Sequence, residues 1–227
     1  MDTFIYVVLS ISYIVLFIVA LFLSRRHQII HYDNVIFLVI LALLYDNGML
    51  ALGSYAGEGD LLMQLNEVRY WLHGFITPLL ILFAWNTIRK TEIPFAKRPM
   101  WNLLIILFTL AIIFIEFLTL VGETKLEPKW SYGILSYDMV KEFEIPIMIF
   151  AVMASLLIAS MIVWWRQKWP WYFIGVILMA VAPLIERWLE TGAAHNVAEL
   201  ILMISLVMTK RFQDNYFSSE RITVHRK

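Results

Sequence analysis

Residues 69 to 80 have the sequence Arg69-Tyr70-Trp71-Leu72-His73-Gly74-Phe75-Ile76-Thr77-Pro78-Leu79-Leu80. This stretch opens a hydrophobic segment with an arginine and, one helical turn later, a histidine on the same face. Ionisable groups inside an apolar span are costly to desolvate, so their presence indicates a functional site. Other apolar segments of the chain also carry polar residues, and we predict that these lie at the same depth as Arg69 and His73.

The composition of the chain is typical of a membrane protein. Of its 227 residues, 61% are hydrophobic and 16% are charged, and the mean hydropathy is +0.74. Soluble domains are roughly 45–50% apolar and about a quarter charged. The formal net charge of zero argues against a nucleic-acid partner, and the absence of cysteine excludes disulfides and thiolate chemistry. The partner that this composition implies is the lipid bilayer.

Seven apolar segments predict an all-α fold, a polytopic bundle of seven transmembrane helices. A first segment without a preceding basic residue is expected to be a retained helix and not a signal peptide. We expect residues 1–211 to form one transmembrane domain and residues 212–227 to form a cytoplasmic tail. The segments cover residues 3–24, 35–53, 68–88, 101–121, 140–165, 170–191 and 194–211.

Arginine and lysine indicate the orientation. The first, third and fifth connections and the tail carry many basic residues, whereas the second, fourth and sixth connections hold only Lys125 and Lys129. The positive-inside rule then places the N-terminus outside and the C-terminus in the cytoplasm. We expect a multi-pass protein of a prokaryotic plasma membrane. Its external segment 53–67, which is rich in glycine, is predicted to be a mobile loop.

Proline positions predict where the helices begin and bend. Pro99, Pro146 and Pro170 lie in or near expected first turns, where a missing N–H costs little. Pro78 and Pro183 lie inside expected spans, so kinks are predicted there.

Ionisable residues from six of the seven segments are predicted to share one layer near the outer surface. With a rise of about 1.5 Å per residue, Asp46 and Asn47 lie about 10 Å below the outer boundary, and His73 about 8 Å below it. The same counting places nine further polar residues in this layer or at its outer edge: Arg69, Glu116, Glu142, Glu144, Glu186, Arg187, Glu190, His195 and Glu199.

Carboxylates outnumber fixed positive charges in this layer, because only Arg69 and Arg187 oppose them. Buried carboxylates without enough counter-charge must take up protons, share them or bind a cation. Histidine with carboxylates suits a divalent metal such as zinc, manganese or iron.

The candidate metal ligands are His73, Asp46, Glu186, His195 and Glu199. The candidate catalytic residues are Asp46, His73, Glu116, Glu186 and Glu199, and the supporting polar residues are Asn47, Arg69, Glu144, Arg187 and Glu190. The alternative is that the layer consists of ion pairs that set the helix register.

The inner halves of the predicted spans are apolar and are interrupted only by Ser155, Ser160 and Ser205. A transporter or proton pump needs polar relays through both halves of the membrane. A site that opens to one side is therefore favoured over a pathway through the bundle.

Two sequence motifs resemble those of the microbial rhodopsins. Arg69-Tyr70 followed by Thr77-Pro78-Leu79-Leu80 is similar to the signature of the third rhodopsin helix, and Pro183 followed by Glu190-Thr191-Gly192-Ala193 is similar to the kinked sixth helix and its acidic turn. The counter-ion position is Leu72 and the position of the tryptophan that packs on retinal is His73. No lysine precedes Lys210 in the last span, so no retinal is expected. The resemblance implies a seven-helix fold in which His73 and Glu186 occupy inward-facing pocket positions on opposite walls.

Three functions agree with these patterns. The leading hypothesis is metal-assisted or acid–base hydrolysis of a lipid or another amphiphile at an outward-facing intramembrane site. The alternative is a rhodopsin-like sensor or binding protein without retinal, whose polar layer holds protons or a small ligand. A cation or proton transporter ranks third, because no inner pathway is evident.

Overall fold

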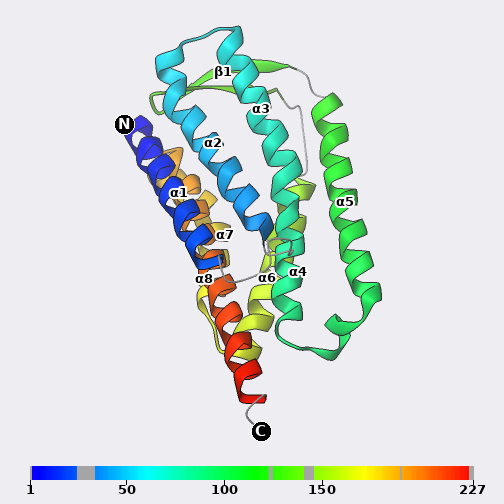
Figure 1. The fold of residues 1–227 in the computed structure, drawn as a ribbon. Coiled ribbons are helices and arrows are strands. Elements are labelled where there is room, and N and C mark those ends of the chain that lie inside the picture. The colour runs from blue at the N-terminus through cyan, green and yellow to red at the C-terminus, as the bar shows by residue number, and fades with distance from the viewer. Residues whose placement is uncertain (1, 25–33, 123–124, 141–145, 190, 225–227) are drawn as a thin grey trace.

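The computed structural model describes residues 2–24, 34–122, 125–140, 146–189 and 191–224, with the side chains of residues 187 and 217–224 excepted. These residues are mostly helical, with one β-hairpin and short connections between the elements (Figure 1). The elements in chain order are α1 (Asp2–Ser24), α2 (Val35–Ala56), α3 (Asp60–Ile76), η2 (Thr77–Leu79), α4 (Leu80–Arg89), η3 (Pro94–Lys97), α5 (Pro99–Gly122), β1 (Leu126–Ser131), β2 (Ile134–Met139), α6 (Ile147–Gln167), α7 (Trp171–Leu189) and α8 (Ala193–Val224).

Six helical segments within the described residues are long and apolar enough to cross a membrane. One of them, Asp60–Arg89, comprises α3, η2 and α4 in succession. The apolar part of α7, Trp171–Glu186, is shorter than these six. The predictions of an almost wholly helical fold and of a multi-pass membrane protein are confirmed at this level.

Prolines lie where helices begin or change. Pro78 lies in the 3₁₀ turn η2, which separates α3 from α4, so the predicted break there is confirmed. Pro99 begins α5, Pro146 is the N-cap residue of α6, and Pro170 directly precedes α7. Helix α7 continues through Pro183. At a helix start the missing N–H of proline costs little, because that N–H would have no helical partner. Inside α7, neighbouring groups must satisfy the carbonyl that Pro183 leaves without a donor.

The segment 53–67 is helical except at residues 57–59, so the prediction of a loop over its whole length was wrong. Helix α2 continues to Ala56 and α3 begins at Asp60. Gly57 ends α2 with φ of 74°, a conformation that glycine adopts without strain. Gly53 serves a different purpose, because a Cβ there would run into the backbone carbonyl of Leu135. Gly53 therefore permits close packing of strand β2, which contains Leu135, and does not indicate mobility.

The hairpin β1–β2 was not predicted from the sequence. Its strands pair antiparallel from Leu126 opposite Met139 to Ser131 opposite Ile134. Tyr132 and Gly133 form the turn with φ of 51° and 82°, as a two-residue type I′ turn requires. The hairpin covers one end of the bundle beside α2 and α3 (Figure 1). We call this the hairpin end.

The helices pack as a bundle with one loosely attached member. Helix α1 lies against α2 and α8, α7 lies along α8, and α4 lies along α6. Helix α5 lies at the edge of the bundle beside α3 and α4 (Figure 1), and most of its apolar side chains are exposed. Exposed leucine and phenylalanine along a 24-residue helix fit a surface that contacts lipid.

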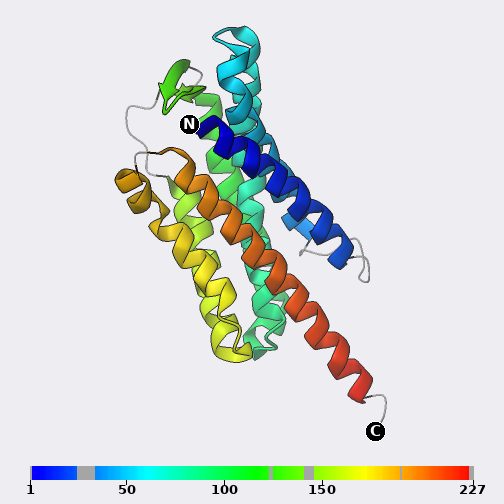
Figure 2. The same cartoon turned by 90° about the vertical axis from the view of Figure 1, so that its left-hand side faces the viewer.

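Helix α8 runs the length of the bundle and extends beyond the other helices at the end opposite the hairpin (Figure 2). Helix α8 continues to Val224, past the end of the apolar segment 194–211, so the change to polar composition at residue 212 does not mark the end of the helix. The assignment of residues 212–227 to a cytoplasmic tail stays a prediction.

Candidate functional site

An ion pair links three helices near the hairpin end. The Nε atom of Arg69 on α3 lies 3.1 Å from Oδ1 of Asp46 on α2. Asn196 on α8 donates from Nδ2 to Oδ2 of the same carboxylate over 3.2 Å. Both oxygens of Asp46 are thus engaged. This arrangement fits the structural alternative for these two charges, because it holds α2, α3 and α8 in one register.

The hairpin covers this ion pair from above. Arg69 also donates to Oδ1 of Asn66 over 3.2 Å, and its guanidinium carbon lies 4.9 Å from the ring centre of Tyr70. The Tyr70 hydroxyl donates to the backbone carbonyl of Tyr137 on β2 over 3.1 Å. The Arg69 guanidinium therefore contacts the Asp46 carboxylate, the Asn66 amide oxygen and the Tyr70 ring.

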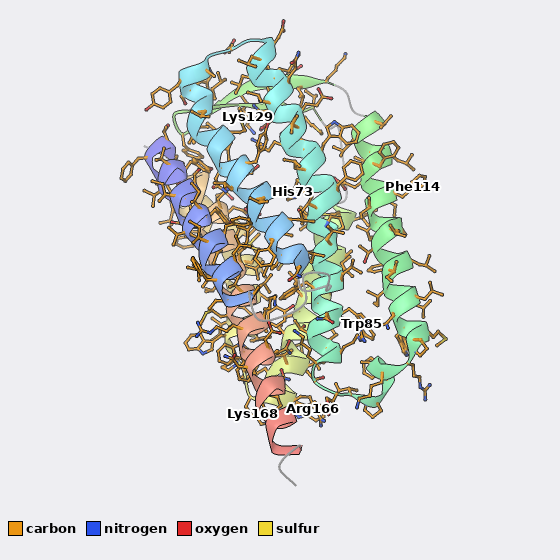
Figure 3. The ribbon with its side chains drawn as sticks, viewed as in Figure 1. His73, Trp85, Phe114, Lys129, Arg166 and Lys168 are labelled. Carbon is orange, nitrogen blue, oxygen red and sulfur yellow. The ribbon has the colours of Figure 1, made fainter. Side chains whose placement is uncertain are left out.

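A cavity lies one helical turn further into the bundle than the ion pair. Its volume is about 80 Å³. One water occupies roughly 10–15 Å³ of such a cavity, so there is room for several. Figure 3 shows His73 in the half of the bundle that is nearer the hairpin. The polar lining residues are His73, Thr77, His195 and Glu199, and the apolar ones are Val39, Leu43, Leu80, Ile149, Val152, Met153, Leu156, Met179, Leu202 and Met203.

The four polar lining residues form two pairs, each on one helical face. The Nδ1 atom of His73 lies 3.2 Å from Oγ1 of Thr77, a hydrogen bond whose donor depends on the imidazole tautomer. The Nε2 atom of His195 lies 3.8 Å from Oε1 of Glu199, which is too long for a direct hydrogen bond. A water or a ligand atom can therefore join His195 to Glu199.

Two further polar atoms near this region lack a partner. The hydroxyl of Tyr13 and Oδ1 of Asn47 are fully buried and accept or donate no hydrogen bond among the described residues. Nδ2 of Asn47 is engaged, because it donates to the Leu43 carbonyl over 2.8 Å. Buried polar atoms without a partner indicate room for water or a ligand atom.

Of the remaining predicted site residues, Glu116 and Glu186 are described by the structure, and neither lines the cavity. Glu116 on α5 packs against Gly74 on α3, where an added Cβ would lie 3.0 Å from its Cγ. Glu186 on α7 is half-buried and interacts electrostatically with His195, but it does not line the cavity. The predicted residues Glu142, Glu144 and Glu190, and the side chain of Arg187, lie outside the described part of the structure.

The predicted metal ligands are divided among different surroundings. Asp46 faces Arg69 and Asn196, Glu186 lies outside the cavity, and His73, His195 and Glu199 line it. In the described ranges, no three histidine, aspartate or glutamate side chains gather closely enough to hold a metal ion. His195 and Glu199 alone would supply two donors. The expectation of zinc, manganese or iron stays a prediction.

Sequence reasoning did not find Thr77, Met179 or Tyr13. Thr77 belongs to the resemblance motif, and its place one turn after His73 could have indicated a shared face. A tyrosine or methionine inside an apolar span is typical of core packing and carries no signal of its own. The cavity that Thr77 and Met179 line forms only when α2, α3, α6, α7 and α8 come together.

A second polar network lies at the end opposite the hairpin, at and beyond the ends of the predicted spans. Lys90 and Lys210 donate to separate oxygens of Asp214, over 2.8 and 2.7 Å. Gln213 donates to the Thr87 carbonyl and to Gln167. An apolar layer that includes Ile40, Phe83 and Leu206 separates this network from the cavity. The serines at 155, 160 and 205 each donate to a carbonyl of their own helix.

Fold and cavity define a polytopic helical membrane protein with a pocket inside the bundle. Comparison with protein-family models, with curated proteins and with solved structures finds no match for this chain. The resemblance to microbial rhodopsins therefore depends on the sequence motifs alone.

Proposed function

We propose that the chain spans the membrane seven times, with its N-terminus and the hairpin outside. The six long apolar segments and the shorter Trp171–Glu186 supply seven candidate spans. Arg166 and Lys168 lie at the end opposite Lys129 of the hairpin (Figure 3). Because the connections at that opposite end carry most of the basic residues, the positive-inside rule supports this orientation.

We propose that the protein binds a small amphiphile in the cavity near the hairpin end. One observation carries this proposal: a single cavity combines four polar side chains with a lining that is otherwise apolar. Ligand sites in proteins are typically concave and apolar, with a few polar groups that set the orientation of the ligand. A molecule with an apolar body and one polar group matches such a lining.

The polar side chains indicate an uncharged polar group on the ligand. Imidazole can donate or accept, the Thr77 hydroxyl can do both, and Glu199 offers carboxyl oxygens. No lysine or arginine belongs to the described lining of the cavity. A carboxylate or phosphate would face Glu199 without a fixed positive charge beside it, which is unfavourable at low dielectric. A hydroxyl, carbonyl or amide group suits the site better.

The proposal is tested with the full chain in lipid nanodiscs and a long-chain alcohol that carries a photoactivatable diazirine. We expect saturable labelling of the cavity lining, which an excess of unlabelled alcohol competes away. Glu199→Gln and His73→Ala should weaken the labelling. The matched control is Glu67→Gln, because Glu67 is exposed on α3 and contacts Trp71 instead of the cavity. Uniform labelling of lipid-facing α5 without competition would contradict the proposal.

A second candidate function is hydrolysis of a neutral ester or amide in the same cavity. His195 and Glu199 lie close enough to share a water, and an imidazole that orients or deprotonates water is a common general base. The test measures release of fatty acid from a monoacylglycerol by the purified protein. His195→Ala should abolish turnover. Plasma mass spectrometry of protein prepared without chelator, with EDTA as the treatment, distinguishes metal-assisted from acid–base hydrolysis.

A further inference from the structure

The hairpin closes the bundle above the cavity on the side of α2 and α3. Leu135 and Tyr137 of β2 are buried against Met49 and Leu62. Hydrogen bonds hold the hairpin in place, since Ser54 donates to the Gly133 carbonyl and the Gly59 N–H donates to the Tyr137 hydroxyl. A ligand that arrives from the water above α2 and α3 therefore meets packed side chains and a paired strand.

Polar contacts close the next layer. The Arg69–Asp46 pair and Asn196 join α3, α2 and α8 directly above the cavity. At the start of α8, the buried carboxylate of Asp2 accepts hydrogen bonds from Thr191 Oγ1 and from the Gly192 N–H, over 2.8 and 3.0 Å. This contact ties the beginning of α1 to the beginning of α8.

The cavity opens instead toward α6 and α7. Ile149 on α6 lines it and is 47% exposed, whereas Leu156, one to two turns further along α6, lines it and is fully buried. Met153 and Met179 are half-buried, so their exposure lies between that of Ile149 and that of Leu156. The side chains at this mouth are all apolar, and α6 is a membrane-spanning segment. The mouth therefore faces lipid.

Helix α7 packs tightly against α8 at Gly175 and lacks one backbone hydrogen bond at Pro183. A Cβ at Gly175 would run into Ser205, so α7 lies in close contact with α8 toward the end opposite the hairpin. Pro183 has no N–H, so the carbonyl of Met179 lacks its usual helical donor. Met179 lies at the mouth of the cavity. The half of α7 nearer the hairpin is thus the part that can move without breaking the contact at Gly175.

We propose that the ligand is a single-chain membrane lipid with an uncharged head, which enters laterally from the leaflet on the hairpin side through the mouth between α6 and α7. This inference rests on the proposed function of the cavity. The head group reaches His73, Thr77, His195 and Glu199, and the chain lies among the apolar lining residues.

A route from water past His195 is the alternative, because the His195 side chain is 39% exposed at the start of α8. The two routes differ in which substitution slows entry. A tryptophan at the lateral mouth obstructs a lipid that enters between α6 and α7 but leaves the polar end of the cavity intact.

The experiment measures the association rate of the diazirine alcohol with the full chain in nanodiscs by time-resolved photolabelling. Ile149→Trp and Met153→Trp should slow association by about tenfold, which corresponds to about 1.4 kcal/mol of added barrier. The matched control is Ile158→Trp, since Ile158 is exposed on the same helix outside the cavity lining. Its association rate should equal that of the original chain.

Association at the original rate in both mouth variants overturns the lateral route while leaving binding itself in place. Loss of saturable, competable labelling in the original chain overturns the proposed function and this inference together. Slowed association in the Ile158→Trp control as well as in the mouth variants also counts against the route, because the effect would then be independent of the mouth.

Discussion

The two ends of the bundle bury polar groups in different ways. At the end opposite the hairpin, Lys90, Lys210 and Asp214 form a saturated cluster, and the adjoining cavity of about 10 Å³ holds at most one water. At the hairpin end, a paired layer formed by Asp46, Arg69 and Asn196 lies above a cavity eight times larger, about 80 Å³. Buried charge alone therefore does not indicate a ligand site. Polar groups beside empty volume do.

The largest expected effect is on stability, at the paired layer of the hairpin end. Asp46→Ala would leave the Arg69 guanidinium without its carboxylate, and breaking a buried pair costs roughly 3–5 kcal/mol. We expect a loss near 3 kcal/mol, since both side chains remain partly exposed. Unfolding by SDS in mixed micelles measures it. The double variant Asp46→Leu with Arg69→Met should recover much of the loss, and failure to recover it would show that the pair does more than fix register.

The second-largest effect is expected at the end opposite the hairpin, where a substitution should lower stability without changing ligand binding. Asp214→Ala removes the carboxylate that Lys90 and Lys210 share, and loss of a partner by a charged group costs about 2 kcal/mol. Both lysines have long, flexible side chains whose ammonium groups can turn toward water, which limits the cost. The same unfolding assay should detect the loss, while photolabelling by the alcohol stays unchanged. Weakened labelling would mean that the two ends are coupled.

A smaller effect, on binding and not on stability, is expected at the cavity. Glu199→Gln keeps the shape of the side chain but replaces one carboxyl oxygen with an amide NH₂, which can only donate, so the affinity for the alcohol should fall by about tenfold, or about 1.4 kcal/mol. The free energy of unfolding should stay the same or rise, because a buried carboxyl is costly to desolvate. Competition photolabelling gives the affinity. An affinity equal to that of Glu67→Gln would assign Glu199 a structural role.

The smallest expected effect is at the surface of the hairpin. Asp138 accepts a 2.8 Å hydrogen bond from Lys129, and this bond raises the pKa of the Lys129 ammonium above its ordinary value. A raised pKa stabilises the fold below the pKa of the unfolded chain, and this stabilisation is lost as the pH rises through the folded pKa. Lys129→Ala should cost roughly 0.2–1 kcal/mol, as an exposed pair does, and less in high salt. Hydrogen exchange of the β1–β2 amides between pH 7 and alkaline pH measures this difference.

Much of the fold was accessible from the sequence because lipid imposes simple rules. A helix must satisfy its own backbone in hydrocarbon, so apolar length predicts the spans well, and the positions of Pro78, Pro99, Pro146 and Pro170 agree with their starts and breaks. The hairpin and the helical segment 53–67 were missed, since their polar composition resembles that of a loop. Only the contact of Gly53 with the Leu135 carbonyl explains why glycine is present there.

The sequence by itself determined that the chain is a helical membrane protein with ionisable groups inside its apolar segments, because composition and hydropathy depend only on residue type and order. It also indicated His73, His195 and Glu199 as candidates. Only the tertiary structure separated Asp46 and Arg69, which pair with each other, from the three residues that line the cavity. Depth along a helix can be counted from the sequence, but the direction in which each side chain points depends on how α2, α3, α6, α7 and α8 rotate against one another.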